Sequence, residues 1–161
     1  MDISADRNTI VTGQIGKSPS VHVWDAHTCE KKSAFQLAPD SRGVQAVSIS
    51  SCGRYVAATD MSNDHKVFVH NIERNVQLLQ IDGSKDKIVD IQWSKRPDDL
   101  RFVTVSPREL YFWHPCDVTR KLKQKGIFNK AAQTNLLCTS FDEEGWCYTG
   151  GENGLIQVWS D

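Results

Sequence analysis

Long apolar runs are absent from this chain of 161 residues. No run approaches the roughly 18 residues that a membrane-spanning helix needs. The N-terminus, from Met1 to Arg7, also lacks the charged and then apolar order of a secretory signal. We therefore expect a cytoplasmic protein with no membrane partner.

A surplus of charge of either sign is also missing. The chain has 19 Lys and Arg against 20 Asp and Glu, which gives a formal net charge of −1. Dedicated nucleic-acid binders usually carry a strongly basic domain, so we expect no nucleic-acid partner. The five cysteines are an odd number without regular spacing, which argues against a secreted disulfide framework and favours reduced thiols.

Catalytic signatures are likewise lacking. The sequence has no phosphate-binding loop of the Gly-x-x-x-x-Gly-Lys-Ser/Thr type, no Gly-x-Ser-x-Gly elbow and no His-Glu-x-x-His pair. Residues 13–18 have two residues between their glycines rather than four, and β-prone sequence on both sides, which indicates a tight turn. The pairs Glu143-Glu144 and Asp98-Asp99 lie in expected turns, where solvated charges are common. We expect no enzyme activity and no cofactor.

His and Cys residues lie close together in the sequence at two places, but neither place has a full set of metal ligands. His22, His27 and Cys29 form one group, and His114 and Cys116 form another. Neither supplies four ligands at zinc-site spacing, so we expect no metal centre.

Sustained helical periodicity is missing too, and a repeat takes its place. Four segments share an order of apolar, any, apolar, then Trp or His, followed by a polar residue. Their fourth positions, Trp24, His70, Trp113 and Trp159, follow one another at 46, 43 and 46 residues. Such constant spacing of β-prone segments indicates a repeat architecture.

Further β-prone segments surround each of these four and complete the unit. One series comes directly before them: residues 9–13, 55–60, 101–106 and 146–151. An earlier series covers residues 44–50, 88–94 and 136–142, and a last series covers 31–36, 76–82 and 123–128. Four short strands in about 40 to 46 residues match one blade of a WD-type β-propeller. We predict an all-β fold of four-stranded antiparallel blades, with repeat segments at about 1–36, 37–82, 83–128 and 129–161.

The expected strands do not complete a ring. The chain begins in or just after an inner strand at Ile3-Ser4 and ends at the close of a third strand, which gives 14 clear strands and about three and a half blades. Closed propellers have roughly four to eight blades. We expect an open propeller that is a piece of a longer one, or that self-associates through its open blade edges.

Blade stacking also predicts where particular side chains lie. Each sheet is covered on both faces by its neighbours, so the middle strands can be apolar on both sides, as in residues 110–113. Trp24, Trp113 and Trp159 are expected in the core. Cys138 and Cys147 fall on consecutive expected strands of one blade, where we expect a reduced pair in the core.

Several segments resemble the echinoderm microtubule-associated protein-like family. They are residues 12–19 leading into 21–25, residues 60–65, the aromatic strand 110–113 with the lysine-rich segment 123–130 after it, and residues 148–159. The resemblance covers nearly the whole chain and implies the first three to four blades of that family's N-terminal propeller. It also implies a tubulin or microtubule partner and a place at the cytoskeleton. His70 departs from the pattern, which has Trp there, and the Gly-His pair common before the first strand of WD repeats is missing; Lys85-Asp86 lies near its place in the third repeat.

One charge feature suggests where a partner binds. Five cations lie within 11 residues that contain no Asp or Glu; this basic segment consists of Arg120, Lys121, Lys123, Lys125 and Lys130. Tubulin surfaces are acidic, so a basic outer strand would speed and strengthen docking. Two alternatives remain: lysines that only protect an exposed strand edge, and a generic WD-repeat scaffold for a ciliary or signalling assembly.

Overall fold

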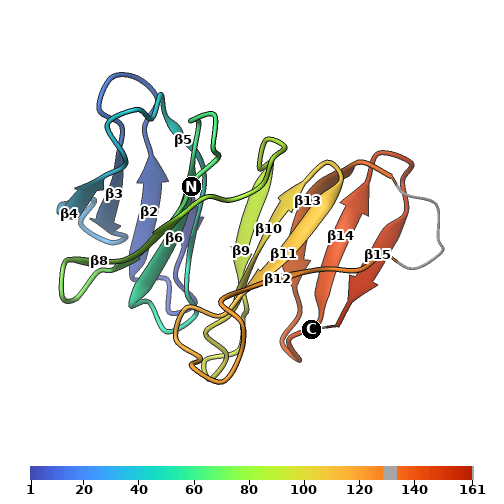
Figure 1. The fold of residues 1–161 in the computed structure, drawn as a ribbon. Helices are drawn as coiled ribbons and strands as arrows, with labels where there is room; N and C mark the ends of the chain where they lie inside the picture. Colours follow the sequence, from blue (N-terminus) through green and yellow to red (C-terminus); the bar gives the residue numbers. More distant parts are fainter. Residues whose placement is uncertain (129–133, 161) are drawn as a thin grey trace.

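The computed structural model describes residues 1–128 and 134–160 and contains four antiparallel sheets side by side (Figure 1). The first sheet comprises β1 (Asp2–Ile3), β2 (Thr9–Gly13), β3 (Ser20–Asp25) and β4 (Lys31–Gln36). The second comprises β5 (Val44–Ile49), β6 (Tyr55–Asp60), β7 (Val67–Asn71) and β8 (Val76–Ile81). The third comprises β9 (Asp90–Trp93), β10 (Phe102–Ser106), β11 (Glu109–Trp113) and β12 (Lys123–Lys125). The fourth comprises β13 (Leu136–Phe141), β14 (Cys147–Gly151) and β15 (Ile156–Trp159).

This arrangement confirms the all-β, open-propeller prediction and corrects its strand count. The described residues hold fifteen strands, one more than expected, because Asp2 and Ile3 pair with Val11 and Ile10 as a short inner strand. The sequence placed the start of the chain in or just after an inner strand at Ile3-Ser4 but did not count that strand among the 14, because two residues are too few to show an alternating pattern. The strand expected over residues 123–128 is also shorter, since β12 ends at Lys125.

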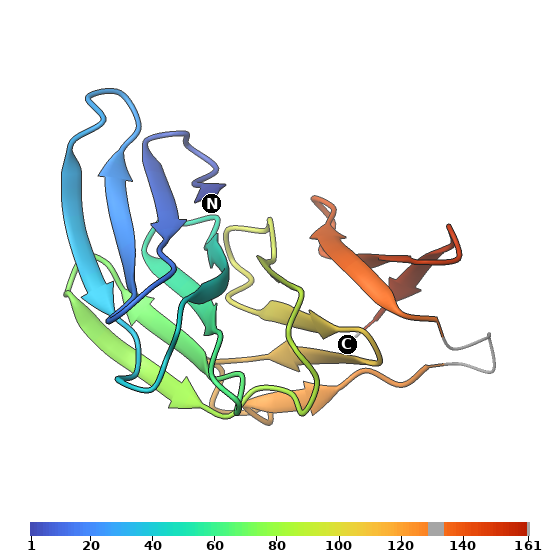
Figure 2. The same ribbon diagram turned by 90° about the horizontal axis from the view of Figure 1, so that it is seen from above.

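The four sheets follow one another along an arc that stays open (Figure 2). In each sheet the strands pair in chain order, and the first strand of each sheet contacts the first strand of the next. The last strand of the first three sheets, β4, β8 and β12, therefore lies on the outer side of the arc. No helix in the described part of the chain is long and apolar enough to cross a membrane.

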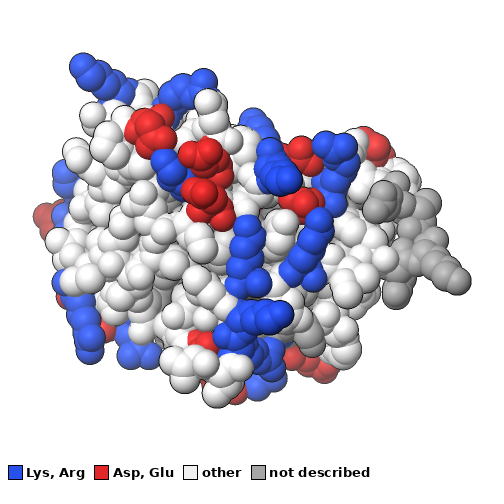
Figure 3. Space-filling model, in the orientation of Figure 1, with Lys and Arg blue, Asp and Glu red and all other residues white. Residues whose placement is uncertain are grey.

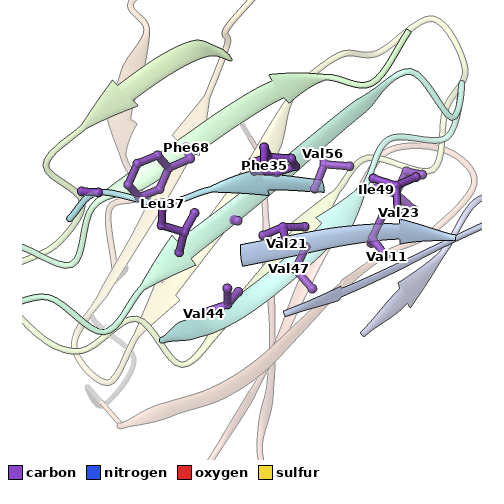
Figure 4. Close-up of a cluster of buried hydrophobic side chains, with 12 residues drawn as sticks. Val11, Val21, Val23, Phe35, Leu37, Val44, Val47, Ile49, Val56 and Phe68 are labelled. Carbon is purple, nitrogen blue, oxygen red and sulfur yellow. The ribbon is translucent and has the colours of Figure 1, made fainter. Parts of the chain in front are cut away.

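The core lies between successive sheets rather than inside any one of them. Valines of β2 and β3 pack with Phe35 against Val47, Ile49 and other side chains of the second sheet (Figure 4). Equivalent clusters fill the spaces between the second and third sheets and between the third and fourth. The middle strands β6, β7 and β10 are almost entirely buried, whereas β13 and β15 include exposed residues because the fourth sheet is covered on one face only.

Side-chain oxygens link the inner strands across sheets. The Asp2 carboxylate accepts hydrogen bonds from the Ile49 N–H and the Ser48 hydroxyl, at 2.9 and 2.8 Å. The Ser48 hydroxyl in turn accepts the Trp93 N–H at 3.2 Å, and the Asp90 carboxylate accepts the Thr139 N–H at 2.8 Å. These bonds satisfy backbone groups that no strand pairing reaches, and they connect each sheet to the next.

Candidate partner-binding surface

Two parts of the third sheet carry the described members of the basic segment. Lys123 and Lys125 lie on β12, and Arg120 and Lys121 lie on the loop 114–122 that leads into it. Lysine and arginine side chains run down the outer face of the molecule in this region (Figure 3). Lys130 lies outside the described residues.

Lys123 is turned inward and supports the fold. Its ammonium group donates hydrogen bonds to the carbonyls of Asp82 and Gly83, at the end of the second sheet. It also lies 4.2 Å from the centre of the Tyr111 ring and 5.1 Å from that of Trp113. Burial lowers the pKa of Lys123. The lysine thus joins two sheets, a role that its position within a run of cations did not reveal.

Lys125 is exposed but paired. Its ammonium group lies 2.7 Å from the Glu109 carboxylate, which also accepts a 2.6 Å hydrogen bond from the Ser84 hydroxyl. The lysine lowers the pKa of Glu109, and the carboxylate raises the pKa of Lys125. Because the lysine is exposed, a stronger acidic partner in solvent can compete for it.

Arg120 and Lys121 complete the described part of the segment. Arg120 lies 3.6 Å from the Asp117 carboxylate, three residues earlier, and both side chains are about half exposed. Lys121 is exposed and has no carboxylate within ion-pair distance among the described residues. Glu109 and Asp117 pair with cations of the basic segment but lie outside the 11 residues that contain no Asp or Glu. The sequence of the basic segment alone therefore overstated the local positive charge.

An adjacent hollow of about 500 Å³ lies between the loops 94–101 and 114–122. Its charges are balanced. Arg96 makes two hydrogen bonds to Asp98, at 2.8 and 3.2 Å, and Arg101 lies 2.7 Å from Asp99. Arg101 also donates to the Gly145 carbonyl, which ties the third sheet to the fourth. These ion pairs hold the loops in place next to Arg120, which lines the same hollow.

The cysteine prediction is wrong in its geometry. Cys138 is exposed and pairs across the strands with Gly150, whereas Cys147 is buried and pairs with Phe141. Cys138 is three residues from Phe141 in a regularly paired stretch of β13, so its side chain lies on the opposite face of the sheet from those of Phe141 and Cys147. Both thiols are free, and burial raises the pKa of Cys147 to about 11, so that thiol stays protonated.

Of the tryptophans expected in the core, Trp113 and Trp159 are buried and Trp24 is partly exposed. Trp24 lies on the face of β3 opposite Val21 and Val23, which pack against the second sheet, and no other described sheet covers that face. Within residues 1–128 and 134–160, no three His, Cys, Asp or Glu side chains are arranged to hold a metal ion.

The sequence of the chain is similar to a family model and to several known proteins. A family model described as the first β-propeller of the echinoderm microtubule-associated protein matches residues 1–161. A ciliary WD repeat-containing protein, ctxp80 of Euplotoides octocarinatus, is 34% identical over 99% of the chain and 22% of its own length. Echinoderm microtubule-associated protein-like 1 of Rattus norvegicus is 30% identical over 98% of the chain and 20% of its own length.

These matches concern only part of each relative, since the chain spans about a fifth of their length. Among solved structures, the WD40 repeats of RRP9 superpose with a TM-score of 0.74 at 19% identity, covering 98% of the chain and 46% of that structure. The structural likeness supports the propeller fold alone.

Proposed function

The chain belongs to the echinoderm microtubule-associated protein family, in the part that forms the first β-propeller, and from this we propose that it is a non-catalytic protein-binding module that docks on microtubules. The observation that carries the proposal is the family match over the full chain, together with relatives named for microtubule association. We accordingly propose a cytoplasmic, cytoskeletal location.

The basic segment is the surface that we propose for this contact. Arg120, Lys121 and Lys125 are all exposed, Lys125 on β12 at the outer side of the third sheet and the other two on the loop that leads into it. An acidic tubulin surface would attract such a rim over a Debye length of about 8 Å at physiological salt. The attraction should therefore weaken as salt is added.

Microtubule pelleting of the 161-residue chain tests the proposal. We expect the double variant Lys121→Glu, Lys125→Gln to pellet several-fold less than the parent at low salt, with a smaller difference at high salt. Gln is chosen at 125 because a second carboxylate beside Glu109 would disturb the fold. Lys31→Glu with Lys32→Gln is the matched control, because it changes the net charge by the same amount and both lysines lie exposed on β4, the outer strand of the first sheet.

Two outcomes would count against this surface. Equal pelleting of the double variant and the parent at low salt would exclude the basic segment. Equal loss with the Lys31, Lys32 control would show that overall charge, and not this strand, drives the binding.

A second candidate function is a scaffold for a ciliary assembly. It is favoured by the 34% identity to a protein named as a ciliary WD repeat protein. If the unmodified chain fails to pellet with microtubules at low salt, the scaffold becomes the better account.

A further inference from the structure

A second surface lies on the loops at the other end of the sheets from the loop 114–122. Four loops meet there: 14–19 between β2 and β3, 37–43 between β4 and β5, 61–66 between β6 and β7, and 82–89 between β8 and β9. They reach the upper side of the ribbon in Figure 1. A hollow of about 380 Å³ opens between them and is lined by Ile15, Arg42, Gln45, Met61, His65 and Lys87.

The apolar lining of this hollow is held by backbone pairing. Ile15 is 75% exposed, yet it forms a β-bridge with Gly43, and the adjoining Gly16 N–H donates to the Arg42 carbonyl at 3.0 Å. A Cβ at Gly43 would lie only 2.9 Å from the Met61 sulfur and 3.2 Å from the Ile15 side chain. Glycine at 43 therefore lets Ile15 and Met61 approach each other. Ile15 and Met61 together give the hollow a fixed apolar lining.

The cations that line the hollow are those that the local acids leave unpaired. Asp40 and Asp64 lie 2.7 and 3.9 Å from the Lys66 ammonium group, and Asp86 pairs with Arg108 at 3.1 Å. Arg42 instead donates to the Met61 carbonyl and the Asn63 side chain, both neutral groups, at 3.1 and 3.3 Å. Among the described residues, no carboxylate lies within ion-pair distance of Arg42 or Lys87.

Gln45 adds to this hollow a hydrogen-bond acceptor without a partner among the described residues. Its Oε1 atom is buried and has no hydrogen-bond partner within the part of the chain that the structure describes. A buried acceptor without a donor costs free energy, which a bound N–H group would recover once the Gln45 amide rotates to present this oxygen to the hollow. The hollow thus combines an apolar lining, two cations without acidic partners and an unused acceptor.

We propose that this hollow binds an acidic peptide segment of a partner protein, which inserts one apolar side chain between Ile15 and Met61. The carboxylates of the segment lie against Arg42 and Lys87, and one of its N–H groups donates to Gln45. Methionine suits such a contact, because its unbranched side chain adapts to the shape of the inserted group. The proposal does not depend on microtubule binding through the basic segment.

Fluorescence anisotropy with four labelled heptapeptides tests the proposal. The probe has glutamate at every position except a central phenylalanine. The comparison peptides change the centre to alanine, or the flanks to serine or to lysine. We expect the probe to bind about tenfold more tightly than the alanine and serine peptides, and the lysine peptide not to bind.

Matched variants locate the binding. Arg42→Gln with Lys87→Gln should raise the Kd of the probe about tenfold, whereas Lys85→Gln, two residues away and equally exposed, should leave it unchanged. Ile15→Ser should remove the preference for phenylalanine over alanine. Leu155→Ser is its control, because Leu155 is also exposed and lies in the corresponding turn of the fourth sheet.

The proposal is overturned if the probe shows no binding up to millimolar concentration, or if it binds no better than the alanine or serine peptide. Equal binding by the parent and the Arg42, Lys87 double variant would also overturn it. Lys121→Gln separates the two surfaces: a loss of peptide binding in that variant would assign the peptide to the basic segment instead.

Discussion

The indole N–H of Trp113 donates a 2.9 Å hydrogen bond to the Thr104 hydroxyl on the neighbouring strand β10, two residues along from Phe102, which is the residue paired with Trp113. The same bond joins Trp24 to Thr12 and Trp159 to Thr149, each at 2.8 Å. The second sheet departs from this rule at both positions, because His70 takes the place of tryptophan and Ala58 takes the place of threonine. The ring of His70 instead stacks on Phe35 of the first sheet, with ring centres 4.1 Å apart.

The tryptophan-threonine pair predicts a stability cost. Thr104→Val keeps the shape of the side chain but leaves the buried Trp113 N–H without an acceptor. We expect the free energy of unfolding to fall by about 1–3 kcal/mol, measured by urea denaturation. Thr119→Val, in an exposed loop, should change it by less than about 0.5 kcal/mol. Equal effects of the two variants would contradict the structural role of the bond.

Burial of His70 should make the free energy of unfolding depend on pH. Burial lowers its pKa below the ordinary value of 6.5, although a 3.2 Å hydrogen bond to Asn75 opposes the shift. Between the lowered folded value and about 6.5, the unfolded chain binds more protons than the folded one. The free energy of unfolding should therefore rise with pH through this window and fall on acidification.

Urea titrations at several pH values on both sides of 6.5 test this expectation for His70. His70→Phe preserves the ring that stacks on Phe35 and removes the titrating group, so its stability should change less with pH than that of the parent. An unchanged pH profile in the variant would contradict the assignment of the effect to His70.

The buried carboxyl of Asp90 should make the free energy of unfolding change with pH in the opposite direction. Burial raises the pKa of Asp90 above 3.8 despite the hydrogen bonds that it accepts from the Thr139 and Ile91 N–H groups. The folded state then holds the proton more tightly, and stability is lost as the pH rises through the window between the unfolded and folded values.

Two substitutions at Asp90 separate its charge from its hydrogen bond. Asp90→Asn keeps an oxygen acceptor without the charge, so at neutral pH it should be at least as stable as the parent. Asp90→Ala leaves the Thr139 N–H without its acceptor and should cost about 1–3 kcal/mol. Chemical denaturation at neutral pH distinguishes them, and a destabilised Asp90→Asn variant would contradict the burial argument.

The repeat made the fold predictable, whereas the surfaces depend on contacts between repeats. Spacing of 46, 43 and 46 residues between Trp24, His70, Trp113 and Trp159 was enough to place the strands. The partners of Lys123 and Lys125, by contrast, are the Gly83 carbonyl and Glu109, which are remote in sequence. Ile15, Met61 and Lys87 come from three different loops, so no linear motif could indicate their hollow.

Removing the charge of Lys123 should destabilise the fold, whereas removing that of Lys121 should not. Lys123→Met keeps most of the apolar stem but removes the donor to the Asp82 and Gly83 carbonyls. We expect it to lower the free energy of unfolding by about 1–3 kcal/mol, because hydrogen bonds to charged groups are stronger than average. Lys121→Met should leave stability within about 0.5 kcal/mol. Thermal unfolding of both variants tests the assignment, which fails if the two melt alike.

The open face of the fourth sheet predicts self-association. Ile156 and Val158 are 73% and 57% exposed and project from the same face of β15, whose only paired strand among the described residues is β14. Exposed apolar side chains on an edge strand favour pairing between copies. We expect the sedimentation coefficient of the chain to rise with concentration. Ile156→Lys with Val158→Lys should suppress this rise, because two charges on the strand oppose both apolar contact and close pairing.

Val118→Lys is the control for this prediction, because Val118 is 99% exposed but lies on the loop 114–122 of the third sheet. It should sediment like the parent. If Val118→Lys suppressed the rise instead, the contact would lie at the loop 114–122 of the third sheet. A parent chain that stays monomeric at every concentration would mean that the exposed face of β15 does not pair, and that the two apolar side chains tolerate water without a partner.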